Sequence, residues 1–170
     1  MDSRQADADA RANRDLVDRF YRAFANLDGA TMATCYAADA EFQDEVFTLH
    51  GRDEIAAMWN MLCEATRSKG MDAWSLDYGD VAANASTGSA HWEAHYRFSA
   101  TGRLVHNRID ARFRFCDGLI ASHRDRFDFW AWSRQALGAP GWLLGWTPLL
   151  RRKVAARAAS NLAAFRSHAS

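Results

Sequence analysis

Two side chains capable of acid–base chemistry, His123 and Asp125, stand two positions apart in a stretch of alternating polar and apolar residues. Alternate residues of a β-strand point to the same face of a sheet, so the imidazole and the carboxyl are predicted to face the same way. An acid and an imidazole on an apolar wall need partners or a function, because unpaired buried polar groups are costly. We predict a catalytic pair, with a purely structural pairing as the alternative.

The Asp117-Gly118 hairpin signal decides which face of the sheet carries this pair. A two-residue loop pairs Leu119 with Cys116 and turns Asp125 toward an arginine-rich face. A three-residue loop with a glycine bulge pairs Leu119 with Phe115 and turns Asp125 toward an apolar face. Only the second register gives one apolar and one charged face, the usual arrangement of a half-buried sheet, so we predict it.

In this register Asp125 lies beside Ile109 and His123 beside Ala111 on the inner face of the sheet. Asn107 is the one further polar group there, and its amide is a candidate donor to an enolate oxygen. Aromatic side chains are predicted to shape a mostly apolar cavity around these groups. They are Phe20, Phe24, Trp59, Trp92, Tyr96, Phe113 and Phe127.

The spacing of apolar residues predicts the elements that position these groups. Three helices come first, at about residues 10–27, 30–36 and 53–69, with short extended pieces over 40–44 and 46–49. Asp53 is the predicted N-cap of the third helix, which ends at Gly70.

From Trp74 to about Trp130 the period changes to two, which predicts long strands joined by hairpins. Helices followed by strands indicate an α+β fold, in which a curved antiparallel sheet wraps around the N-terminal helices. A helix over about 151–166 closes the chain.

One domain is the natural expectation for 170 residues. We predict a loose tail over 1–9, a main domain over 10–130, and a tryptophan-rich extension over 131–170 that packs on the same domain. The net charge of zero gives no reason to expect nucleic acid, and the three cysteines lack metal-ligand spacing. With neither a signal peptide nor an apolar run of about 18 residues, a cytoplasmic location is expected.

Several motifs, in this order and spacing, resemble the nuclear transport factor 2-like superfamily, in its SnoaL-like polyketide cyclase and ketosteroid isomerase-like branch. They are Tyr36-Ala37-Ala38-Asp39-Ala40, His50-Gly51-Arg52-Asp53-Glu54-Ile55 and Cys116-Asp117-Gly118-Leu119-Ile120 with His123-Arg124-Asp125-Arg126-Phe127-Asp128. The resemblance covers about residues 10–130. It implies a cone-shaped α+β roll with a pocket between helices and concave sheet, and a homodimer through the outer sheet face.

The resemblance also implies roles for single residues. Asp125 stands where the SnoaL-like cyclases have their acidic residue and limonene epoxide hydrolase has one catalytic Asp. The Arg-x-Asp partner motif of that hydrolase is absent, because Trp92-Glu93-Ala94 stands there. Asp44 resembles the general base of ketosteroid isomerase.

The two oxyanion groups of ketosteroid isomerase are not reproduced. Phe20 matches its oxyanion Tyr, with Tyr21 adjacent. Asp110 matches its second acid but is predicted to face outward.

Two functions remain open at this point. The first is an enzyme without metal or organic cofactor that acts by proton transfer on a hydrophobic carbonyl substrate, with Asp125, His123 and Asp44 as catalytic residues. The second is a non-catalytic module that binds a hydrophobic small molecule or a protein. An open cavity that reaches His123 and Asp125 would favour the enzyme, and a pocket filled by its own side chains would favour the module.

The apolar aromatic stretch from Trp142 to Leu150 precedes a basic cluster, Arg151-Arg152-Lys153. Such a combination can mark contact with a membrane surface. We favour a lid over the pocket mouth or a dimer contact, since large exposed apolar patches are rare on soluble monomers.

Overall fold

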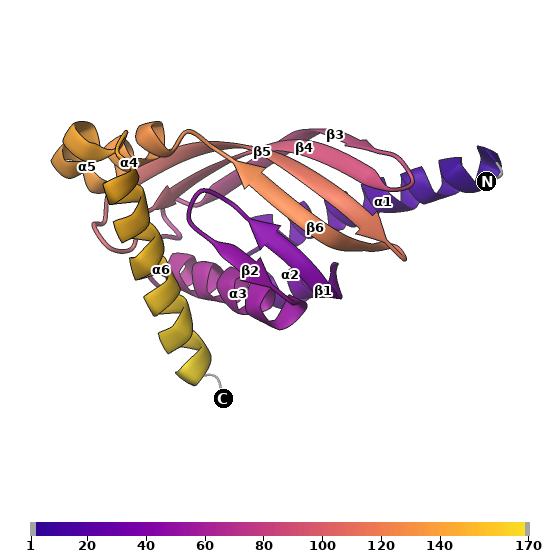
Figure 1. The fold of residues 1–170 in the computed structure, drawn as a ribbon, viewed down its shortest axis with the longest axis horizontal. Helices are drawn as coiled ribbons and strands as arrows, with labels where there is room; N and C mark the ends of the chain where they lie inside the picture. The colour runs from indigo at the N-terminus through magenta and orange to yellow at the C-terminus, as the bar shows by residue number, and fades with distance from the viewer. Residues whose placement is uncertain (1–2, 169–170) are drawn as a thin grey trace.

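A computed structural model describes residues 3–168, which form six helices and six strands (Figure 1). The helices are α1 (Ser3–Ala25), α2 (Gly29–Ala33), α3 (Arg52–Lys69), α4 (Phe129–Leu137), α5 (Ala139–Leu144) and α6 (Pro148–His168). The strands are β1 (Tyr36–Gln43), β2 (Thr48–His50), β3 (Ser75–Ala83), β4 (Thr87–Arg97), β5 (Leu104–Cys116) and β6 (Leu119–Arg126). The predicted α+β fold is confirmed.

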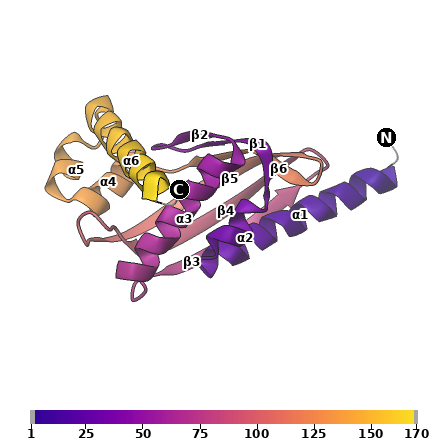
Figure 2. The same cartoon turned by 90° about the horizontal axis from the view of Figure 1, so that it is seen from below.

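The strands form one curved, unclosed sheet in the order β2-β1-β6-β5-β4-β3. The pairing of β1 with β6 is parallel, so the sheet is mixed rather than antiparallel throughout. Parallel strands need a long connection, and here α3 and the β3–β5 meander separate the two. Figure 2 shows α1, α2 and α3 together on one side of the sheet. The main core lies between these helices and the sheet, and includes Val17 and Phe20 of α1 and Ile55 of α3.

The predicted three-residue loop before β6 is wrong. Cys116 pairs with Leu119, and both Asp117 (φ 51°) and Gly118 (φ 73°) have the left-handed conformation of a two-residue turn. The extra residue lies further along, where Ala121 forms a bulge and shifts the register.

Because of this bulge, the side chains of His123 and Asp125 face the predicted side of the sheet but pair with different residues of β5. Asp125 pairs with Ala111 instead of Ile109, and His123 pairs with Phe113 instead of Ala111. Both side chains therefore face inward. Asp110 faces outward, where its Oδ1 lies 2.8 Å from His91 Nδ1.

The helix starts also differ from expectation. Residues 3–9, expected as part of a loose tail, are helical, and the side chain of Gln5 donates to Asp9 at 2.7 Å. Residues 1–2 lie outside the described range. The N-cap of α3 is Gly51 rather than Asp53, which lies in the first turn.

The last strand ends at Arg126, not near Trp130. Asp128 caps α4, because its side chain accepts the Ala131 backbone N–H at 2.9 Å. The tryptophan-rich extension is therefore helical from Phe129 onward. Within residues 3–168, no helix is both long and apolar enough to cross a membrane.

We expect Gly118→Ala to lower the free energy of unfolding by about 1–2 kcal/mol, because a Cβ is disfavoured in the left-handed region. A Cβ at Gly118 would meet no atom within 4 Å, so the cost comes from φ alone. Gly79→Ala is the matched control, since a Cβ there also meets nothing within 4 Å and φ is not left-handed. Urea unfolding measures both variants, and equal losses would contradict this turn geometry.

Candidate active site

His123 and Asp125 lie together on β6, at the inner face of the sheet. His123 Nε2 is 3.0 Å from Asp125 Oδ1, and the two residues are only 1% and 4% exposed. An ionised carboxylate can only accept hydrogen bonds, so Nε2 is the donor when His123 pairs with Asp125 in its carboxylate form. His123 Nε2 and Asp125 Oδ1 thus satisfy each other in a dry environment, as buried polar atoms require.

Tyr36 of β1 extends the pair into a chain of hydrogen bonds. Its hydroxyl lies 2.7 Å from His123 Nδ1 and accepts from Trp59 Nε1 at 3.1 Å. When the imidazole is neutral and donates from Nε2, its Nδ1 accepts a hydrogen bond from the Tyr36 hydroxyl. Burial raises the pKa of Tyr36 well above its usual value, so this hydroxyl keeps its hydrogen.

Aromatic rings enclose the imidazole of His123 on several sides. Five ring centroids lie between 4.5 and 6.2 Å from it, those of Phe20, Tyr36, Phe42, Trp59 and Phe113. Phe24 packs behind them, 4.9 Å from Trp59. Four predicted cavity residues, Phe20, Phe24, Trp59 and Phe113, are therefore core residues that keep solvent from His123.

Asp125 is bonded through one oxygen only. Trp92 of β4 donates Nε1–H to Oδ1 at 3.4 Å, and His123 donates to the same atom. Within the described part of the chain, Oδ2 receives no hydrogen bond. Oδ2 is thus the atom with which Asp125 can bind a ligand or exchange a proton.

Asp44 follows β1 and supplies a second carboxyl that is only half-buried. Its Oδ1 accepts the backbone N–H groups of Val46 and Phe47 at 2.7 and 2.6 Å. Burial raises the pKa of Asp44 to about 6, and the charge of Asp125 acts in the same direction, although the two hydrogen bonds lower it. A carboxyl with this pKa can act as a general base near neutral pH.

Tyr96, Asn107 and Phe127 are half-buried, like Asp44, and we call these four residues the rim. Trp132 of α4 donates Nε1–H to the Tyr96 hydroxyl at 2.9 Å. Burial raises the pKa of Tyr96 to about 12, with a contribution from the charge of Asp44. The Asn107 side chain has no hydrogen-bond partner among residues 3–168, so its amide is available to a ligand.

Tyr21 of α1 is a polar residue to which the sequence pattern assigns no role. It is fully buried, and its ring stacks on that of Tyr78 with 5.0 Å between the ring centroids. Its hydroxyl has no hydrogen-bond partner in the described structure. Burial raises its pKa, and the charge of Asp125 adds to the shift. The alternation of buried residues in β1 would place Tyr36 on the inner face, but neither tyrosine could be linked to the His123–Asp125 pair from sequence.

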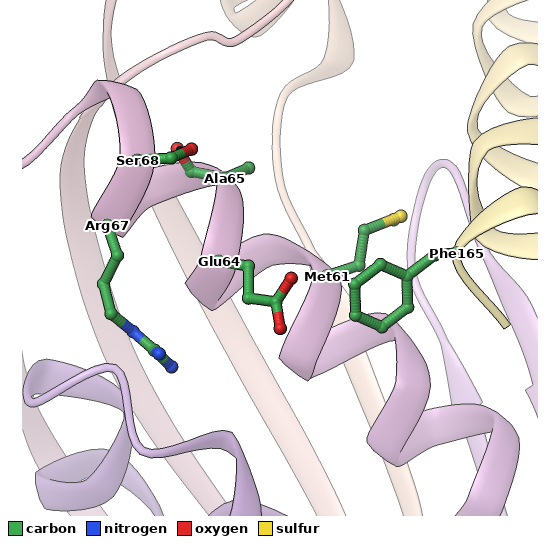
Figure 3. A pocket seen from close by; sticks show the side chains of 6 residues that line it. All are labelled: Met61, Glu64, Ala65, Arg67, Ser68 and Phe165. Atoms are coloured by element: carbon green, nitrogen blue, oxygen red, sulfur yellow. Dashed lines mark hydrogen bonds between the residues drawn. The ribbon is translucent and has the colours of Figure 1, made fainter. Parts of the chain in front are cut away.

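A separate hollow of about 530 Å³ lies between α3 and α6 (Figure 3). Met61 and Phe165 give it an apolar side, and Glu64 and Arg67 carry its charges. No predicted site residue lines it, so it is distinct from the His123–Asp125 pair.

A curved, unclosed mixed sheet covered by helices on one face is the fold of the nuclear transport factor 2-like class. A family model described as the SnoaL-like domain matches residues 17–123. The chain therefore belongs to the SnoaL-like family, and the predicted resemblance is confirmed. A comparison with curated proteins finds no match.

Solved structures share this fold at low sequence identity. A candidate polyketide cyclase from Xanthomonas campestris pv. campestris is 19% identical over 75% of this chain and 98% of that chain, with a TM-score of 0.60. An LEH-like epoxide hydrolase from M. tuberculosis is 17% identical over 83% and 96% of the two chains, also with a TM-score of 0.60. A protein with a ketosteroid isomerase-like fold from Catenulispora acidiphila, in complex with trimethylamine, is 16% identical over 78% of this chain and 97% of that chain, with a TM-score of 0.60. These likenesses establish the fold.

We expect Tyr36→Phe to lower the free energy of unfolding by about 1–3 kcal/mol, because it leaves buried groups of His123 and Trp59 unpaired. Tyr21→Phe is the matched control, since it removes an equally buried hydroxyl that has no partner. Its stability should equal or exceed that of wild type. Urea unfolding at neutral pH measures both, and similar losses in the two variants would disprove the hydrogen-bond chain.

Asp44 should make stability depend on pH. Its pKa is about 6 when folded, against 3.8 for an unperturbed carboxyl, so the folded state binds the proton more tightly. The free energy of unfolding therefore falls as pH rises from about 4 to about 6.

Asp44→Asn cannot ionise but retains an acceptor for the Val46 and Phe47 N–H groups. We expect this variant to exceed wild type at pH 8 by up to about 3 kcal/mol and to match it near pH 4. Urea unfolding at the two pH values tests this, with exposed Asp39→Asn as a control that should change nothing. No gain at alkaline pH would refute the burial cost assigned to Asp44.

Proposed function

We propose that this chain is a cofactor-independent enzyme that moves a proton on a hydrophobic carbonyl substrate, as in isomerisation, cyclisation or dehydration. The observation that supports it is a pair of interacting carboxyls in unequal environments, the half-buried Asp44 and the buried Asp125. Two titratable groups held in different surroundings are a common basis for dividing acid and base roles. The fold alone favours no single reaction.

Asp44 is the proposed base that removes a proton next to the substrate carbonyl. Both of its backbone hydrogen bonds go to Oδ1, which leaves Oδ2 for the substrate. With a pKa of about 6, the carboxyl is mostly ionised at pH 7 yet basic enough to accept a proton.

Asp125 and Asn107 would act after the proton has been removed. Asp125 Oδ2 can return or relay the proton, while His123 holds Oδ1 and thereby sets the direction of Oδ2. The free amide of Asn107 can stabilise negative charge on an enolate oxygen. In this scheme His123 is a positioning residue, because the aromatic rings around it prevent contact with substrate.

Epoxide hydrolysis by the limonene epoxide hydrolase mechanism is not part of the proposal. The position of its Arg-x-Asp motif holds Trp92-Glu93-Ala94, and the Trp92 indole bonds Asp125 itself.

The second candidate is a non-catalytic module that binds a hydrophobic ligand or a protein at the rim. The enclosure of His123 by five aromatic rings favours it, because a pair fully used in packing needs no chemical role. The two candidates differ in whether Asp44 and Asp125 exchange protons with a bound ketone.

Exchange of α-hydrogens for deuterium, followed by proton NMR in D₂O, separates the candidates without knowledge of the natural substrate. The probes are cyclic enones and 1,3-diketones of increasing hydrophobic size. We expect wild type to accelerate exchange, with a rate that rises through a midpoint near pH 6. Asp44→Asn and Asp125→Asn should each lower the rate by about 100-fold or more.

Asp110→Asn is the matched control, because that carboxyl lies on the outer face of the sheet and should leave the rate unchanged. If probes quench tryptophan fluorescence on binding but exchange no faster than in buffer, the binding module replaces the enzyme.

A further inference from the structure

The outer part of the C-terminal extension carries a dense group of exposed apolar side chains. Trp142, Leu143, Trp146 and Leu149 are 59%, 72%, 73% and 70% exposed, and we call them the tryptophan patch. Figure 1 shows α5, which supplies the first two, at one end of the molecule. A concentrated apolar patch on an otherwise well-packed protein marks a surface for interaction.

The patch sits on a rigid support rather than on a loose end. Gly141 is buried where α5 crosses α4, and a Cβ at this position would collide with the backbone carbonyl of Ser133. Arg134 of α4 lies over the Trp130 and Trp142 rings, 4.4 and 4.7 Å from their centroids. The exposed side chains are thus presented by a packed surface.

The segment that carries the patch has only basic charged residues. Residues 129–170 contain six Lys or Arg and no Asp or Glu, although the whole chain has a net charge of zero. On α6, Arg152, Lys153 and Arg157 follow Leu149 at the three- and four-residue spacing of one helix face, and all are exposed. These three form no ion pair with any residue from 3 to 168. Their charge therefore remains available to a partner.

A surface hollow of about 640 Å³ adjoins the patch. Its lining includes Arg103, Arg134, Trp142 and Leu104, and Leu104 is itself 62% exposed. Two guanidinium groups beside exposed apolar side chains suit a phosphate attached to a hydrophobic body.

We propose that the tryptophan patch docks this protein on the surface of a membrane that contains anionic lipids. Tryptophan and leucine side chains would enter the boundary between headgroups and acyl chains, and the basic residues would contact lipid phosphates. A second copy fits less well, because a two-fold contact would set one all-basic segment against another. Nor is the patch a lid, since Trp132 supplies the packing against Tyr96 while the patch faces solvent.

Flotation of the full-length chain with vesicles tests the proposal. We expect binding to vesicles of phosphatidylcholine mixed with phosphatidylglycerol, weaker binding at high salt, and little binding to phosphatidylcholine alone. Each basic side chain near the membrane surface strengthens binding about fivefold. Arg152→Glu combined with Lys153→Glu should therefore reduce binding to the anionic vesicles roughly 25-fold or more. Leu143→Ser combined with Trp146→Ser should abolish it.

Matched controls alter exposed residues elsewhere. Arg112→Glu with Arg114→Glu makes the same charge change on the sheet, and Met71→Ser removes an apolar side chain that is 57% exposed. Both should bind like wild type, and circular dichroism should show all variants folded. The proposal is overturned if anionic vesicles fail to bind the folded protein or if the controls lose as much binding as the patch variants. It is equally overturned if the patch mediates self-association instead, seen as a dimer that Leu143→Ser with Trp146→Ser dissociates.

Discussion

The carboxyl of Asp125 is held away from water, and its Oδ1 is the end of a chain of hydrogen bonds that joins several elements of the domain. His123 and Trp92 donate to its Oδ1, Tyr36 fixes His123, and Trp59 fixes Tyr36. These residues come from β6, β4, β1 and α3, so the hydrogen-bond chain can form only when the sheet and the third helix are assembled together. A partly satisfied network of this kind would be costly in a low-dielectric core.

The hydrogen-bond chain divides the inner face of the sheet into two zones that differ in their access to solvent. Around His123 the aromatic rings leave no access, and this zone is core. Toward the rim, Asp44, Asn107 and Phe127 are half-buried, and the charge of Asp125 contributes to the raised pKa of Asp44. In the proposed enzyme, proton transfer would involve Asp44 at the rim and Oδ2 of Asp125, and the buried zone would hold Asp125 in position. Enzymes commonly separate rigid support from reacting groups in this way.

The C-terminal extension likewise has two parts. Its first helix, α4, buries Phe129 and Trp132 and bonds Tyr96, so it belongs to the folded core. Beyond Gly138 the chain exposes the tryptophan patch and carries only basic charge, although Leu162 of α6 still packs into the main core. One segment thus closes the domain next to the rim and extends into an exposed surface, which places the candidate site and the tryptophan patch in the same part of the molecule.

The alternation of apolar and polar residues determined the strands, the inner face and the pairing of His123 with Asp125, because side chains two apart on a strand must share a face. It could not determine the register. The Asp117-Gly118 turn takes two residues, and an Ala121 bulge that no turn signal announces restores the same face. Nor could it predict that Tyr36 forms a hydrogen bond with His123, 87 positions away, or that the pKa of Asp44 is raised to about 6. Both depend on which groups the assembled sheet and helices exclude from water, and that is decided by tertiary packing.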